Sequence, residues 1–300
     1  MTFAASANCA VYQGAVPVFC DVERDTLLID AQQAEKKVTS KTRAIIAVDY
    51  AGQPCDYNSL KKTAKRHGFV LVADACHSLG GESRGRKVGT LADLNVFSFH
   101  PVKHITTGEG GMIATDNARY AARARIFRNH GIDSDHHRRE KTGSWFYEMT
   151  DLGYNYRITD FQCALGISQL KKMTSILKRR RSIAAFYDQA FAGLKSVRPL
   201  VLQKDVNHAY HLYVLRLDPA AAGMDRDEFF IKMRAQGIGV NVHYIPVHLH
   251  PFYRKKFKTK PGMCPRAEEA YKEIISIPLF PTMKRADVTR VVKAVKNLLS

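Results

Sequence analysis

The sequence has 300 residues, of which 45% are hydrophobic, and its formal net charge is +18. This length exceeds what one core usually accommodates, so we expect one large domain and one smaller domain. No run approaches the roughly 18 consecutive apolar residues of a membrane span, and the first residues lack the basic start of a secretion signal. We therefore expect a cytoplasmic protein with no membrane partner.

The charge and the cysteines narrow the class of protein further. A charge of +18 favours a polyanionic partner, either nucleic acid or a small phosphorylated substrate, and composition alone does not choose between them. Basic side chains are concentrated at 128–141, 171–181 and 253–260, without the aromatic interleaving of an RNA-binding sheet. The six cysteines include no C-x-x-C pair, which argues against a zinc ribbon or a disulfide framework.

Short apolar runs alternate with a helical pattern in the first half of the chain. Strands are predicted at 16–22, 43–50, 69–75, 94–100 and 111–115, and a helix that ends at a glycine is predicted at 56–68. This alternation is typical of α/β proteins, and the nearly continuous apolar runs predict a largely parallel sheet covered on both faces. Active sites of such sheets lie at the carboxyl ends of the strands.

The second half of the chain has a different pattern. Residues 159–194 predict one long helix with an N-cap at Thr159. A strand follows at 208–217, and helices are predicted at 225–237 and near 285–299. We therefore expect a large domain over residues 1–190 and a smaller α+β domain over residues 191–300.

Two of the predicted strands end at residues that can do chemistry. The strand at 69–75 is followed by a turn with Asp74 and His77, and the strand at 94–100 is followed by Lys103. Singly, Asp74 could be a helix cap and Lys103 a solvated side chain. Because the ends of neighbouring parallel strands face one crevice, the two together favour an active site with a carboxylate and an amine.

Four ordered motifs carry a more specific resemblance. The stretches DACHSLGG, FSFHPVKHITTGEGG, LGYNYRITDFQCALGISQL and VHYIPVHLHPFY resemble pyridoxal phosphate enzymes of the aspartate aminotransferase fold, and within them the DegT/DnrJ/EryC1/StrS sugar aminotransferases. The resemblance runs from residue 2 to the C-terminus. It implies fold type I, with a mostly parallel sheet flanked by helices in the large domain and a C-terminal α+β domain, and it implies pyridoxal 5'-phosphate as cofactor.

The resemblance also implies the two catalytic roles. Lys103 occupies the position of the lysine that bonds covalently to the cofactor aldehyde and then carries a proton between substrate and cofactor. Asp74 matches the carboxylate that pairs with the pyridine nitrogen and keeps it protonated. The motif TTGEGG is not a phosphate-binding Walker loop, because no Gly-Lys-Ser/Thr follows.

Further cofactor contacts follow from the same resemblance. Phe3 and Cys76 match positions on opposite faces of the cofactor ring. His77 falls near the ring hydroxyl, and Ser98 matches a hydroxyl that binds the phosphate.

Residues outside this crevice also match the family. Asn155 and Arg157 match residues that reach the neighbouring subunit's cofactor phosphate and substrate, which implies a homodimer with shared sites; an ordinary helix-entry loop is the alternative. His243 lies in a segment that the family places beside the nucleotide-sugar. With His248 and His250 it has a spacing that could bind zinc, but no acidic or cysteine partner is close in sequence, so we expect no metal.

The expected reaction is transfer of an amino group, from glutamate, to a nucleotide-linked keto sugar. The motifs look most like the enzyme that aminates C4 of a UDP-linked 4-keto-6-deoxy-N-acetylhexosamine in pseudaminic acid biosynthesis, and a 3-aminotransferase acting on a dTDP-keto sugar is the alternative. A dehydratase of the family would carry histidine in place of Lys103. A regulatory or DNA-binding member remains a rival, although no helix-turn-helix segment is evident and we expect no nucleic-acid partner.

Relatives in this family carry a segment before the position of Phe3 that helps to hold the cofactor phosphate. We therefore expect a chain of this length to bind the cofactor less tightly than an N-terminally extended one.

Overall fold

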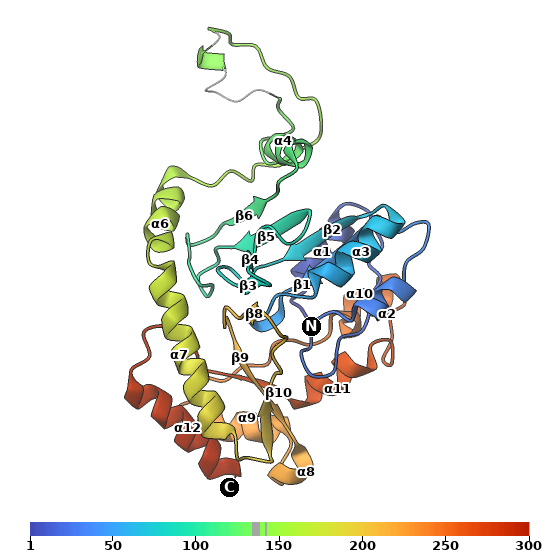
Figure 1. Cartoon of the computed structure of the whole chain (residues 1–300). Helices are drawn as coiled ribbons and strands as arrows, with labels where there is room; N and C mark the ends of the chain where they lie inside the picture. Colours follow the sequence, from blue (N-terminus) through green and yellow to red (C-terminus); the bar gives the residue numbers. More distant parts are fainter. Residues whose placement is uncertain (134–138, 142, 300) are drawn as a thin grey trace.

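The computed structural model describes residues 1–133, 139–141 and 143–299 (Figure 1). Its central sheet has the order β1-β2-β5-β6. Strands β1, β2 and β5 pair in parallel, whereas β6 runs antiparallel to β5. The mixed α/β architecture with a mostly parallel sheet is therefore confirmed. The four strands are β1 (Ala44–Val48), β2 (Val70–Asp74), β5 (Leu94–Ser98) and β6 (Gly111–Ala114).

Helices cover this sheet and connect its strands. The connection from β1 to β2 is α3, which begins after its cap Asp56 and ends where Gly68 takes a left-handed φ of 70°. The helix predicted at 56–68 is thus confirmed. The helices of the first half of the chain are α1 (Ala5–Tyr12), α2 (Ala31–Lys36), α3 (Tyr57–His67) and α4 (Ala118–Phe127).

The strand predicted at 16–22 is wrong. Only Val22 pairs, in an isolated bridge with Ile29. Val16 and Val18 are exposed, at 70% and 66%, and only Phe19 and Val22 of this run pack against a hydrophobic cluster, so the run has no neighbouring strand to complete a sheet. Alternation of apolar residues predicts a strand only where a partner strand is present to accept its backbone hydrogen bonds.

Two smaller sheets follow. The antiparallel sheet β10-β9-β7 lies in the second half of the chain, and a short sheet has the order β4-β3-β8. The strand predicted at 208–217 is limited to its last five residues, because Ala209 and Leu212 donate their N–H groups to the 3-10 turn η1. The elements are η1 (Tyr50–Gly52), β3 (Glu82–Ser83), β4 (Arg86–Lys87), β7 (Val197–Pro199), β8 (Val206–Asn207), β9 (Tyr213–Leu217) and β10 (Ile274–Ile277).

The helix predicted at 159–194 is divided into two. Helices α6 (Asp160–Leu170) and α7 (Met173–Phe191) follow one another along one side of the molecule (Figure 1). The cap at Thr159 is confirmed, because its side chain and that of Gln162 form a capping box. The remaining helices are α8 (Pro219–Ala222), α9 (Arg226–Ala235), η2 (Val247–Leu249), α10 (Pro251–Phe257), α11 (Pro265–Glu273) and α12 (Arg285–Leu299).

Hydrophobic side chains gather in two main clusters. One surrounds the central sheet and includes Leu71 and Phe97, and the other joins α7, β9, α9 and α12 and includes Tyr187 and Phe229. Helix α7 runs across residue 190, so we keep the division of the chain at that residue as a proposal. Of the helices in the described part of the chain, none combines the length and apolar character needed to cross a bilayer.

Candidate active site

The two strand ends singled out in the sequence lie at the same edge of the central sheet. Asp74 is the last residue of β2 and pairs in register with Val96 of the adjacent parallel strand β5. Lys103 follows β5 in a turn that its N–H closes by donating to the His100 carbonyl at 2.9 Å. Burial lowers the pKa of Lys103, although the negative charge of Asp74 acts in the opposite direction. The crevice therefore holds an amine that loses its proton more easily than a surface lysine.

The carboxylate of Asp74 is fixed by two donors. Its Oδ1 accepts the Cys76 N–H at 3.2 Å, and its Oδ2 accepts the Ser6 hydroxyl at 2.6 Å. Ser6 lies 68 positions away in the sequence, on α1. The sequence analysis missed Ser6 because nothing in the local pattern predicts that α1 reaches the end of β2.

His77 lies on the buried side of the same turn. Its Nε2 lies 3.2 Å from the Tyr244 hydroxyl, and the Tyr244 ring lies 6.0 Å from the ring of Phe3. Burial lowers the pKa of His77 well below its ordinary value, and the positive charge of Lys103 lowers it further. Phe3, exposed at 63%, and His77 are thus joined through Tyr244, a residue that the sequence analysis did not single out.

Two further histidines pack behind His77. The ring of His211 lies 4.4 Å from that of His77 and 5.4 Å from that of His104, measured between ring centres. Burial lowers the pKa of His104 to about 3 and that of His211 well below 6.5. The three rings are therefore uncharged at neutral pH. Because these three rings carry no charge, they do not repel the ammonium form of Lys103.

A buried carboxylate shapes the turn that carries these residues. Asp49, fully buried after β1, accepts hydrogen bonds from the Ser78 hydroxyl at 2.5 Å, the Tyr57 hydroxyl at 2.7 Å and the Cys55 N–H at 2.9 Å. Burial raises the pKa of Asp49 to about 6, against the effect of these donors. Because Ser78 directly follows His77, Asp49 fixes the backbone beyond the end of β2.

The remaining predicted residues are divided between this edge and the surface. Ser98 ends β5, and its hydroxyl accepts the His100 N–H at 3.3 Å; Cys76 is half-buried beside Asp74. Arg157 donates to Asn129 at 2.9 Å, and Asn155 forms a bridge with the same residue. Among the residues that the structure describes, neither forms a hydrogen bond with Lys103 or Asp74.

The histidines of residues 243–250 have different partners in the folded chain. His243 Nδ1 lies 2.8 Å from the Ser276 hydroxyl, and burial lowers its pKa to about 4, with a further contribution from the charge of Lys103. His248 is 2% exposed at its side chain and pairs with Glu268 at 2.8 Å. Within 1–133, 139–141 and 143–299, no group of three or more His, Cys, Asp or Glu side chains is placed to bind a metal. His243 is thus the member of this group that lies near the crevice.

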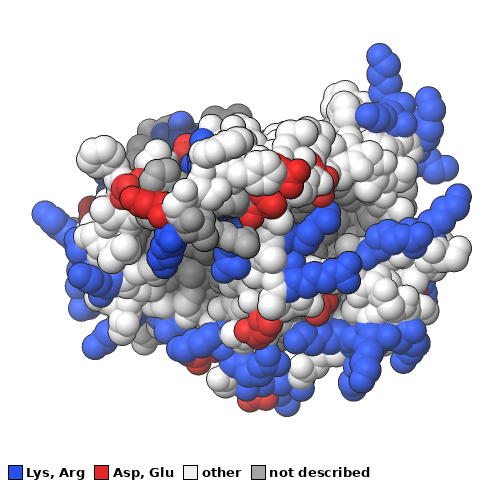
Figure 2. All heavy atoms as spheres, turned by 90° about the horizontal axis from the view of Figure 1, so that it is seen from above, with Lys and Arg blue, Asp and Glu red and all other residues white. Residues whose placement is uncertain are grey.

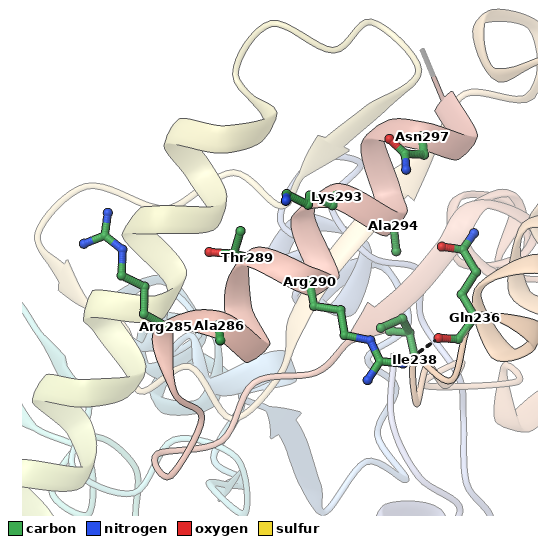
Figure 3. Close-up of a pocket in the computed structure, with 9 residues that line it drawn as sticks. All are labelled: Gln236, Ile238, Arg285, Ala286, Thr289, Arg290, Lys293, Ala294 and Asn297. Carbon is green, nitrogen blue, oxygen red and sulfur yellow. Dashed lines mark hydrogen bonds between the residues drawn. The ribbon is translucent and has the colours of Figure 1, made fainter.

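A separate hollow of about 720 Å³ lies along α12 and the loop after α9 (Figure 3). Its lining includes three cations, Arg285, Arg290 and Lys293, and Arg290 donates to the Gln236 carbonyl at 2.8 Å. None of the predicted site residues lines it. Over the face seen in Figure 2, Lys and Arg side chains are distributed widely and project at the edges, so the positive charge forms no single stripe there.

Comparison with known proteins gives concordant matches. Residues 1–296 match the DegT/DnrJ/EryC1/StrS aminotransferase family. The protein MJ1066 of Methanocaldococcus jannaschii is 44% identical over the whole chain and 78% of its own length. The structure of Helicobacter pylori PseC, an aminotransferase involved in the biosynthesis of pseudoaminic acid, is 32% identical with a TM-score of 0.91, over 99% of this chain and 77% of that one.

A second solved structure bears on the cofactor. The putative sugar aminotransferase Spr1654 of Streptococcus pneumoniae, in its PMP form, is 30% identical with a TM-score of 0.91, over 99% of this chain and 79% of that one.

Proposed function

Because the chain belongs to the DegT/DnrJ/EryC1/StrS aminotransferase family, a family of sugar aminotransferases that depend on pyridoxal phosphate, we propose that it transfers an amino group from glutamate to a nucleotide-linked keto sugar. The observation that carries this proposal is the position of Asp74 at the end of β2 and of Lys103 just after the end of the neighbouring parallel strand β5. The substrate that we favour is UDP-4-keto-6-deoxy-N-acetylhexosamine, aminated at C4, because PseC is among the most similar solved structures.

The residues at this edge fit the cofactor. Asp74 is held at the end of β2 with both carboxylate oxygens oriented by donors, and it retains lone pairs for a third. Lys103 has a half-buried amine whose pKa burial lowers. Phe3 presents an exposed aromatic ring beside this edge. When bound, pyridoxal phosphate supplies an electrophilic aldehyde and a ring that accepts the electron pair released from the substrate carbon.

Lys103 has two tasks in this proposal. Its Nζ, once deprotonated, would hold the cofactor by a covalent bond to the aldehyde carbon, formed with loss of water. When the amino substrate takes its place on the cofactor, the freed Nζ would be the group that holds and moves the proton of the substrate carbon that bears nitrogen. The lowered pKa of Lys103 supports both tasks, because each requires the neutral amine.

Asp74 and the aromatic residues hold the ring. Asp74 would hold the pyridine nitrogen and keep its proton in place. Phe3 and Cys76 contact opposite ring faces, and His77 donates to the ring hydroxyl. His77 is uncharged and its Nδ1 is buried, so Nε2, which lies 3.2 Å from the Tyr244 hydroxyl, is the nitrogen that would make this contact.

Phosphate, substrate and the second subunit complete the proposed site. Ser98 binds the phosphate, and His243 contacts the nucleotide-sugar. Asn155 and Arg157, which lie away from their own Lys103, act in the site of the partner subunit in a cytoplasmic homodimer. Exposed apolar side chains on α6 support this assembly, since Phe161 is 91% and Ile167 57% exposed.

The substrate is tested by offering the holoenzyme glutamate with keto sugars that differ in one feature. We expect turnover of UDP-4-keto-6-deoxy-N-acetylhexosamine and a product with nitrogen at C4, identified by NMR. Turnover of dTDP-keto sugars, with nitrogen added at C3, would instead support the alternative substrate. Lys103→Ala should abolish turnover, whereas Lys87→Ala, which removes a surface lysine paired with Glu82, should not. Salt-sensitive DNA binding without turnover would contradict the proposal.

A further inference from the structure

The carboxylate of Asp74 is the end of a short chain of hydroxyl groups from the first residues of the protein. The Ser6 hydroxyl lies 2.6 Å from Asp74 Oδ2, and the Thr2 hydroxyl lies 2.6 Å from that of Ser6. Ser6 has one hydroxyl hydrogen, and an ionised carboxylate can only accept. The hydrogen of Ser6 therefore points to Asp74. In the contact between Thr2 and Ser6, Thr2 is then the donor, and its single hydroxyl hydrogen goes to Ser6 at 2.6 Å in preference to the Phe3 carbonyl at 3.1 Å.

The helix that carries Ser6 is fixed independently of Asp74. Asn8 of α1 accepts the Tyr253 hydroxyl at 2.5 Å, and Ala7 is buried in a cluster with Val247 and Tyr253. Ser6 is half-buried, between the exposed and the buried face of α1. The position of its hydroxyl is thus set by the packing of α1 against α10 and η2, so Ser6 brings a fixed donor to the end of β2.

This donor also distinguishes the two oxygens of Asp74. Oδ1 accepts a backbone N–H from its own turn, whereas Oδ2 accepts from a distant helix. Hydrogen bonds to a carboxylate stabilise its charged form, and a chain of donors strengthens each of its members. The arrangement therefore favours a rotationally fixed carboxylate, which is the geometry needed to hold a protonated pyridine nitrogen.

We propose that Ser6, supported by Thr2, is a positioning residue that holds Asp74 in the orientation in which it pairs with the ring nitrogen of the cofactor. This inference rests on the proposed function. Ser6 touches neither cofactor nor substrate; it acts through Asp74. The backbone N–H of Cys76 cannot replace it, because that group binds the other oxygen.

The test uses holoenzyme loaded with pyridoxal phosphate labelled with ¹⁵N in the ring, whose NMR signal reports ring protonation directly. In wild type and Ser6→Thr, which keeps the hydroxyl, we expect the signal of a protonated ring from pH 6 to 9. In Ser6→Ala, the signal should move towards that of unprotonated pyridine as the pH rises within this range. Thr2→Val should give a smaller shift in the same direction.

A kinetic measurement accompanies the spectra. We expect kcat of Ser6→Ala to fall about tenfold, in line with loss of a hydrogen bond to a charged group, while KM for the sugar changes less than about twofold. Ser175→Ala is the matched control, because its hydroxyl donates only to the Lys172 carbonyl on α7. This control should match wild type in both measurements.

The outcomes separate the inference from the proposed function. If wild type shows a protonated ring and Ser6→Ala shows the same signal with unchanged kcat, the inference is wrong and the proposed function stands. If wild type forms no covalent link between Lys103 and the cofactor, both fail. If Ser6→Ala does not fold, Thr2→Val provides the test. A ring signal and a kcat of Thr2→Val that are identical to those of wild type would overturn the role of the hydroxyl chain.

Discussion

The buried histidines predict that the protein loses stability in mild acid. Burial lowers the pKa of His208 to about 3, and the positive charge of Arg181 adds to this effect. His208 is 5% exposed, and its Nδ1 accepts the Tyr210 N–H at 2.7 Å. The folded state therefore keeps His208 neutral, whereas the unfolded chain protonates it near its ordinary pKa of about 6.5. Protonation favours unfolding, so the stability from this residue is present above pH 6.5 and is lost as the pH falls.

The size of the loss follows from the linkage between proton binding and unfolding. At pH 5 His208 in the folded state is still unprotonated, because its pKa there lies well below 5. The loss of stability therefore depends only on the ordinary pKa, which is that of the unfolded chain. The difference between the ordinary pKa of 6.5 and pH 5 corresponds to a loss of about 2 kcal/mol in the free energy of unfolding for each such histidine. His104 has the same lowered pKa of about 3 and should contribute a similar amount.

The assay compares wild type with His208→Asn in urea unfolding at pH 7 and pH 5, followed by circular dichroism. Asparagine keeps an acceptor for the Tyr210 N–H but does not titrate. We expect the variant to lose about 2 kcal/mol less than wild type between the two pH values. His100→Asn, at a side chain that is 48% exposed, is the control and should lose as much as wild type. An equal loss in wild type and His208→Asn would refute the reasoning.

Three further substitutions test how the backbone around the site is held. Asp49→Ala leaves two buried hydroxyls and one backbone N–H without an acceptor, and we expect a loss of about 3 kcal/mol or more in urea unfolding. Gly52→Ala places a Cβ 2.7 Å from the His77 carbonyl at a φ of 108°, so the melting temperature should fall, by an amount equivalent to about 2 kcal/mol. Thr159→Ala removes the capping box of α6, and hydrogen exchange in that helix should accelerate about fivefold.

The central sheet and α3 could be predicted because their signals are local. Apolar runs bounded by turn residues predicted β1, β2, β5 and β6, and Gly68 marked the end of α3. The failures have tertiary causes. Residues 16–18 have strand composition but no neighbouring strand, and residues 208–212 bond to η1 rather than to a sheet. Whether such a segment forms a strand depends on its neighbours in the fold rather than on its intrinsic propensity.

The candidate site shows the same distinction. Asp74 and Lys103 could be found because strand ends of a parallel sheet share an edge, and the family resemblance supplied their roles. Ser6 and Tyr244 could not, because each reaches the crevice from a segment distant in sequence. Asp49 was missed because it lies inside the strand predicted at 43–50, and its three partners come together only in the folded chain.

The most direct test of this account is to reduce the holoenzyme with borohydride and locate the cofactor by peptide mass spectrometry. Borohydride fixes a lysine–cofactor linkage as a stable secondary amine. We expect the cofactor mass on the peptide that contains Lys103, and no visible absorbance band of the linkage in Lys103→Ala. Labelling of another lysine, or a linkage that survives in Lys103→Ala, would contradict the account.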